Sequence, residues 1–152
     1  MPLITRRGAL TLGAGVVVTL LAADESMATP AEADAEIAKF TGGKAAEPAA
    51  PGKIAIDLPE IAENGNVVPL SITVDSPMRA DDYVSDILIV SDGNPFPGVV
   101  KFQLTPMSGR AEAATRIRLA ATENVIVVAK TSTGKFFTAR KLVKVTVGGC
   151  GG

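Results

Sequence analysis

The chain has 152 residues, a formal net charge of −1, no histidine and a single cysteine, Cys150. The near-neutral charge supplies no basic excess for binding nucleic acid or an acidic membrane surface. Without histidine, Ser-His-Asp catalysis, Cys-His catalysis and histidine metal sites are excluded, and one cysteine allows neither an internal disulfide nor a thiolate metal cluster. We therefore expect no catalytic residue, no metal and no cofactor.

Residues 1–28 have the pattern of an export signal. The paired arginines Arg6 and Arg7 precede an apolar run over residues 8–23. That run is shorter than the roughly 20 apolar residues that a membrane span needs. Small residues then lead to a cleavage site after Ala28. The segment is predicted to be a twin-arginine signal that sends the chain to the periplasm, free of the membrane after cleavage. An ordinary secretory signal and an uncleaved anchor are the alternatives.

Residues 29–52 predict a short helix followed by a linker. Thr29 can cap the helix, a proline suits its first position, and Glu32 can reach back as in a capping box. The helix should extend to about Phe40, because two glycines follow shortly after it. Residues 44–52 are rich in alanine and proline, which is typical of a linker. A frayed segment is the alternative to the helix.

Residues 53–147 predict an all-β domain. Apolar and polar residues alternate with a period of two in several segments, which are 54–58, 68–74, 100–105 and 137–147. Pro69 indicates an edge strand or a bulge in the second of them. The nearly continuous apolar run at 125–129 predicts a central strand. About seven short strands without helical crossovers predict an immunoglobulin-like β-sandwich and make a parallel sheet unexpected.

The last five residues place Cys150 between two pairs of glycines. Glycine has no Cβ, so residues 148–152 are expected to form a flexible arm that holds the thiol about 10 Å beyond Val147. The glycines of this arm are Gly148, Gly149, Gly151 and Gly152. A thiolate is the reactive form of cysteine, and no lysine or arginine lies near Cys150 in the sequence. Activation by a partner enzyme is therefore expected, and the chain is predicted to be a carrier and not an enzyme.

Two other groups of polar residues give weaker signals. Asp81, Asp82 and Asp86 have the composition of a metal site, but a solvated acidic turn is the simpler interpretation. Arg116 and Arg118 share one face of a predicted strand and can bind an anion, although a solvated or partner-facing surface explains them as well. No pair of carboxylates stands out for general acid–base chemistry.

The Gly-Gly-Cys-Gly-Gly ending, the paired-arginine start and the sandwich pattern together resemble SoxY, the sulfur-carrier family of bacterial thiosulfate oxidation. The resemblance continues through the body of the chain, at residues 52–54, 61–65, 94–97, 102 and 115–120. It implies that sulfur intermediates are attached covalently to Cys150. It also implies a heterodimer with a SoxZ subunit and visits by periplasmic Sox enzymes that load, oxidise and hydrolyse the bound sulfur.

Two other functions stay open at this point. A carrier of the ubiquitin-like type would hold sulfur as a thiocarboxylate at Gly152, but it needs cytoplasmic ATP and a helix that the strand pattern lacks. A structural β-domain would be tethered to a partner by an intermolecular disulfide through Cys150. A permanently bonded cysteine, however, would not need four flanking glycines.

Overall fold

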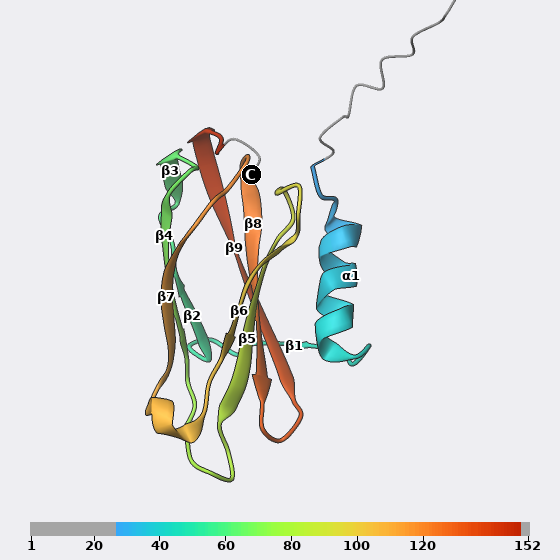
Figure 1. Cartoon of the computed structure of the whole chain (residues 1–152), viewed down its shortest axis with the longest axis vertical. Helices are drawn as coiled ribbons and strands as arrows, with labels where there is room; N and C mark the ends of the chain where they lie inside the picture. The colour runs from blue at the N-terminus through green and yellow to red at the C-terminus, as the bar shows by residue number, and fades with distance from the viewer. Residues whose placement is uncertain (1–26, 150–152) are drawn as a thin grey trace, which may run out of the picture.

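The computed structural model describes residues 27–149, which form nine β-strands, one α-helix and a short 3-10 helix (Figure 1). Two β-sheets face each other, and the helix lies outside the larger one. The predicted all-β, immunoglobulin-like sandwich is confirmed, with nine strands where the sequence indicated about seven. Most of the predicted export signal lies outside the described residues, as do Cys150, Gly151 and Gly152. No described helix is long and apolar enough to cross a membrane.

The larger sheet runs in the order β1-β9-β8-β5-β6, and β3 also pairs with β9. Its strands are β1 (Glu47–Pro48), β3 (Ile61–Asn64), β5 (Val84–Ser91), β6 (Gly98–Gln103), β8 (Glu123–Thr131) and β9 (Phe136–Val147). The smaller sheet runs in the order β2-β4-β7, with β2 (Ile54–Asp57), β4 (Val68–Val74) and β7 (Ala111–Ile117). The 3-10 helix η1 (Pro106–Ser108) connects β6 to β7 across the two sheets.

The core lies between the two sheets. In β4 every second residue is buried, as the period of two predicted. The run 125–129 in β8 is buried on both faces, because β8 lies between β5 and β9 in the larger sheet and is covered by the helix. The predicted central strand is therefore confirmed.

The predicted helix is confirmed as α1 (Pro30–Thr41). Its capping box is complete, because the Glu32 N–H donates to Thr29 Oγ1 at 3.4 Å and Glu32 Oε2 accepts the Thr29 N–H at 2.7 Å. The helix ends at Gly42, whose φ of 64° lies in the left-handed region that glycine adopts at little cost.

The inner side of α1 covers the outer face of the larger sheet. Ala33 is fully buried there, and the rings of Phe40 and Phe136 meet edge to face with centroids 5.9 Å apart. This packing supplies the apolar contacts that a short amphipathic helix needs to be stable. The helix is therefore part of the folded domain.

The structure contains two short strands beside β9 that the sequence did not predict. The expected linker at 44–52 contains β1, which pairs in parallel with β9. The sequence also gave no signal for β3, which pairs in parallel with β9 further along, with Ile61 opposite Lys144. Both strands are short additions to one edge of an otherwise antiparallel sheet. Parallel pairing therefore occurs here without any helical crossover between adjacent strands.

The expectation that Pro69 marks an edge strand is also corrected. Its strand, β4, is the middle strand of the smaller sheet. The Asp75 N–H points towards β2, where it donates to the Lys53 carbonyl at 2.8 Å. Every second backbone nitrogen of a strand faces the same neighbour, so the nitrogen of Pro69, six residues before Asp75, also faces the side of β2. The pairing with β2 stops at Ser71. The missing N–H of Pro69 therefore faces a position that β2 does not reach.

Candidate functional site

The end of β9 is bound between two loops at one end of the sandwich. Three backbone hydrogen bonds link the segments: Gly65 N–H to the Val147 carbonyl at 2.8 Å, Leu119 N–H to the Gly65 carbonyl at 2.8 Å, and Gly149 N–H to the Leu119 carbonyl at 2.9 Å. We call these four residues the Gly149 seat. Gly149 is buried, and Cys150 is the next residue in the chain. The seat therefore fixes the point from which the thiol extends.

Close backbone approach explains the glycines in the seat, Gly65 and Gly149, and the neighbouring Gly148. A Cβ on Gly65 would lie 2.2 Å from the Leu119 carbonyl oxygen, and one on Gly148 would lie 2.1 Å from the Ala120 carbonyl oxygen. A Cβ on Gly149 would lie 3.0 Å from the Gly65 carbonyl oxygen. None of these three glycines has a positive φ. Their role is steric, because only a residue without a side chain allows these segments to meet.

The flexibility of the arm at residues 148–152 stays a prediction, and the structure shows where its first two residues, Gly148 and Gly149, lie. Both are packed against the body of the protein, and Gly149 makes a backbone hydrogen bond to it. Glycine permits a loose chain and a tight backbone contact equally well, and the sequence does not show which loops lie beside the tail. For Gly151 and Gly152, and for Cys150 as the attachment point, the expectation stays a prediction.

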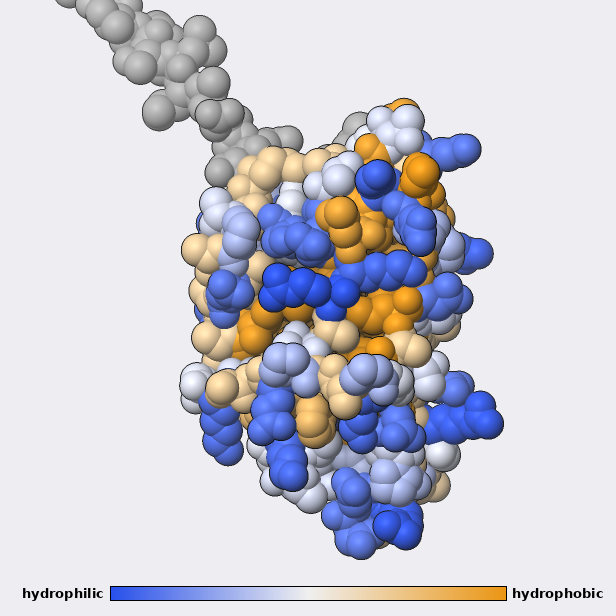
Figure 2. All heavy atoms as spheres, turned by 180° about the vertical axis from the view of Figure 1, so that it is seen from behind, coloured by the Kyte–Doolittle hydropathy of each residue, from blue (hydrophilic) through white to orange (hydrophobic). Residues whose placement is uncertain are grey.

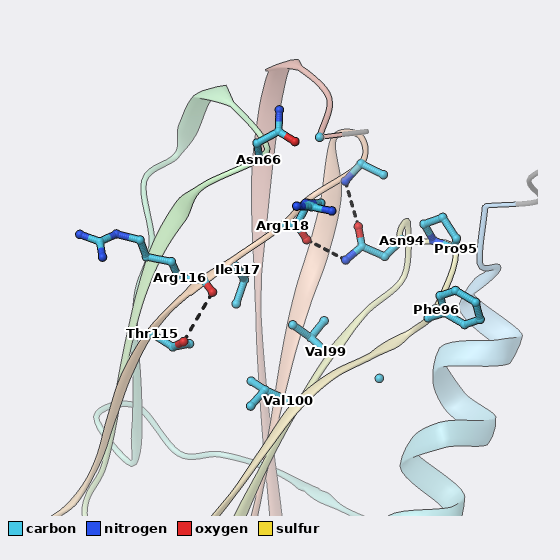
Figure 3. A pocket seen from close by; sticks show the side chains of 13 residues that line it. Asn66, Asn94, Pro95, Phe96, Val99, Val100, Thr115, Arg116, Ile117 and Arg118 are labelled. Atoms are coloured by element: carbon cyan, nitrogen blue, oxygen red, sulfur yellow. Dashed lines mark hydrogen bonds between the residues drawn. The ribbon is translucent and has the colours of Figure 1, made fainter. Parts of the chain in front are cut away.

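A pocket of about 530 Å³ opens beside the seat, between β6 and β7 (Figure 3). Gly149 is part of its wall. Its apolar lining comes from Phe96, Val99, Val100 and Ile117. Its polar lining comes mainly from Asn66, Asn94, Thr115, Arg116 and Arg118. The residue that precedes the only cysteine thus borders a cavity with an apolar interior and a cationic rim.

The two arginines of the rim are not equivalent. Arg118 follows the end of β7, and its Cγ lies 2.6 Å from the position that a Cβ on Gly149 would take. Arg116 lies within β7, and its side chain points away from the cavity in Figure 3. No carboxylate of the described residues lies within 4.0 Å of either guanidinium. The structure thus brings the side chain of Arg118 next to Gly149, although the two residues are 31 positions apart in the sequence.

The acidic residues singled out in the sequence lie elsewhere. Asp86 lies 3.6 Å from Lys101 Nζ and accepts a hydrogen bond from Ser85 Oγ at 2.8 Å. Asp81 is exposed and lies 3.8 Å from Arg79. Within residues 27–149, no three acidic or cysteine side chains are grouped closely enough to hold a metal ion.

The structure contains a buried carboxyl group that no sequence pattern predicted. Glu123, at the start of β8, is only 3% exposed. Its Oε1 accepts a hydrogen bond from Ser91 Oγ at 2.8 Å, while no described group bonds to Oε2. Burial raises the pKa of Glu123 to about 7; the Ser91 hydrogen bond lowers it and the charge of Asp92 raises it further. A glutamate at a strand end resembles any solvated turn acid, so the sequence offered no signal.

A family model and one solved structure point to the same family. The family model described as "Sulfur oxidation protein SoxY" matches residues 37–150. The solved structure of the sulfur carrier protein SoxY from Chlorobium limicola f thiosulfatophilum is 33% identical, with a TM-score of 0.63, over 77% of this chain and 98% of that one. Among curated proteins, no significant match was found.

A superoxide reductase (neelaredoxin) from Ignicoccus hospitalis is 18% identical, with a TM-score of 0.56, over 78% of this chain and 94% of that one. At that identity the likeness shows a shared fold alone. The family match, by contrast, covers most of this chain and includes its cysteine. The chain belongs to the SoxY family.

Proposed function

We propose that this protein is a periplasmic sulfur carrier that holds thiosulfate-derived intermediates covalently on Cys150 and presents them to partner enzymes. The observation that carries the proposal is the position of Gly149. It is seated beside an apolar pocket with an arginine at its rim, and the only cysteine of the chain is bonded directly to it. Family membership and the solved SoxY sulfur carrier support the same role.

The proposed loading step joins the thiolate of Cys150 to the outer sulfur of thiosulfate. A sulfur–sulfur bond forms, two electrons leave to the partner enzyme that loads the carrier, and the adduct ends in a sulfonate. The sulfonate is an anion that pairs well with a guanidinium, while the divalent sulfur is apolar and polarisable. Arg118 and the apolar lining of the pocket match these two parts of the adduct.

The proposed partners are a SoxZ subunit, in a heterodimer, and the periplasmic Sox enzymes that act on the bound sulfur. The surface supports association with a protein, because apolar side chains are exposed between charged ones on the face shown in Figure 2. Ile61 of β3 and Leu142 of β9 are 60% and 51% exposed, and the register of the two strands places them close together. The paired arginines near the start of the chain support export.

The sandwich fold disfavours the thiocarboxylate alternative, because carriers of that type have a β-grasp helix that this sandwich lacks. Its single described helix instead lies on the outer face of the larger sheet.

Replacing the thiol tests the proposal directly. Cys150→Ser should abolish thiosulfate-dependent oxygen uptake in a reconstituted system, while circular dichroism and melting temperature stay unchanged because this residue follows the last strand. Ser132→Ala, in the hairpin between β8 and β9, is the control and should leave uptake at the wild-type rate. Turnover by the Cys150→Ser protein would refute covalent carriage on Cys150.

A further inference from the structure

Asn94 holds the loop that supports the Gly149 seat (Figure 3). Its Nδ2 donates to the Arg118 carbonyl at 2.8 Å, and its Oδ1 accepts the Ala120 N–H at 2.9 Å. The residue between them is Leu119, whose carbonyl accepts the Gly149 N–H at 2.9 Å. One side-chain amide thus fixes the backbone on both sides of the group that binds Gly149.

Asn94 is itself held by the loop that carries it. Ser91, which is fully buried, accepts the N–H groups of Gly93 at 3.4 Å and Asn94 at 3.3 Å through its Oγ. The same hydroxyl donates to Glu123 Oε1 at 2.8 Å. Pro95 follows Asn94 and restricts the backbone before it. A chain of hydrogen bonds therefore runs from the buried Glu123 through Ser91 and Asn94 to the Gly149 seat.

We propose that Asn94 is a positioning residue for the thiol: it keeps Gly149 seated and so limits how far Cys150 reaches from the body of the protein. The proposal rests on the proposed function, in which Cys150 carries the cargo. Cα atoms are about 3.8 Å apart along the chain. With Gly149 seated, Cys150 is one such step along the chain from a residue that the body of the protein holds. With the chain released back to Val147, three extended residues give a reach of about 10 Å.

These two positions suit two different tasks. The seated position keeps the adduct at the pocket, and the released position offers it to the active site of another protein. Release requires the Gly149–Leu119 hydrogen bond to break, and the strength of that bond depends on how well Asn94 fixes the acceptor. Loss of the Asn94 amide should therefore shift the arm towards the released position without changing the chemistry of the thiol.

Amide hydrogen exchange of Gly149, measured by NMR on the full chain, tests this proposal. Asn94→Ala removes both hydrogen bonds, and Asn94→Asp keeps the acceptor for Ala120 but loses the donor to Arg118. Both should accelerate exchange at Gly149 at least fivefold, while the amide of Val127 in the core changes less than twofold. The matched control is Asn124→Ala. It removes a 2.8 Å hydrogen bond from the Asn124 side chain to Asp92, which lies two residues before Asn94, but it leaves the hydrogen bonds of residues 118–120 unchanged.

A second measurement links the seat to the thiol. Cys150 is first converted to a mixed disulfide with 2-mercaptoethanesulfonate, and its reduction by dithiothreitol is timed. Reduction should be faster in both Asn94 variants than in the wild type and in Asn124→Ala.

If hydrogen exchange at the Gly149 amide is unchanged in both Asn94 variants, or rises only together with exchange at the Val127 amide, Asn94 is not a positioning residue. Reduction at the wild-type rate, with Gly149 exchange accelerated, would equally refute a role in limiting the thiol. Neither measurement requires physiological cargo, so a failure of the proposed function would be seen separately, in the Cys150→Ser assay.

Discussion

The substitution Glu123→Gln should abolish the part of the pH dependence of folding stability that the ionisation of Glu123 causes. Glu123 is almost fully buried, with one oxygen bonded to Ser91 and the other without a described partner. Glu123→Gln keeps the size of the side chain and an acceptor for Ser91, but it cannot ionise. The substitution therefore isolates the effect of the carboxyl group.

The sign and size of the effect follow from the pKa. Burial raises the pKa of Glu123 from about 4.5, the value expected in the unfolded chain, to about 7 in the folded protein. Because the folded state holds the proton more tightly, this stabilising contribution is fully present below pH 4.5 and is lost as the pH rises through 7. The difference between the two pKa values corresponds to a loss of about 3 kcal/mol in the free energy of unfolding.

Urea unfolding between pH 4.5 and 8.5 measures this loss. The free energy of unfolding of the wild type should fall, relative to that of Glu123→Gln, by about 2 to 3 kcal/mol across the range, with unchanged urea m-values. Glu112→Gln, at an exposed residue that pairs with Arg110, is the control and should follow the wild type. Parallel curves for the wild type and Glu123→Gln would refute the assignment of a buried, protonated carboxyl.

The other predictions concern the seat, the rim of the pocket and the partner. Gly148→Ala and Gly65→Ala should each lower the free energy of unfolding in urea by about 1–3 kcal/mol, because the added Cβ meets a backbone carbonyl oxygen. Wild-type stability of both variants would contradict the close packing. Arg118→Gln should slow the reaction of Cys150 with an anionic methanethiosulfonate by about threefold at low salt, and it should leave the reaction with a neutral methanethiosulfonate unchanged. Arg116→Gln is the control. Equal slowing of the two reactions would contradict an electrostatic role for Arg118. Co-expression with SoxZ should give a 1:1 complex by light scattering, and two separate monomers would contradict the proposed partner.

The sequence was sufficient for the helix and for most strands of the sandwich. The capping residues of α1 and the alternation in β4 depend on neighbours within a few positions, so local patterns carry them. The short strands β1 and β3 have no such pattern. Their pairing with β9 depends on contacts between residues some 83 to 90 positions apart, such as Ile61 with Lys144, which periodicity does not reveal.

The tail shows why the site was predicted only in part. The resemblance to the SoxY family predicted Cys150 as the attachment point, but the role of Gly149 depends on Gly65 and Leu119, which approach it only in the folded protein. The same is true of Arg118, which lies next to Gly149 in space and 31 positions away in sequence. Asn94 lies in a segment that resembles the family, but no pattern in the sequence indicated the roles of Asn94 and Glu123, because those roles come from hydrogen bonds between distant segments.

Intact mass spectrometry tests the central claim most directly. The protein is purified without reductant from the periplasm of cells that are oxidising thiosulfate, and the peptide containing Cys150 is then sequenced by fragmentation. The account predicts sulfur-containing mass increments located on Cys150 and removed by reduction, and none on the Cys150→Ser protein. A thiol found unmodified under these conditions, or bonded permanently to another protein, would contradict it.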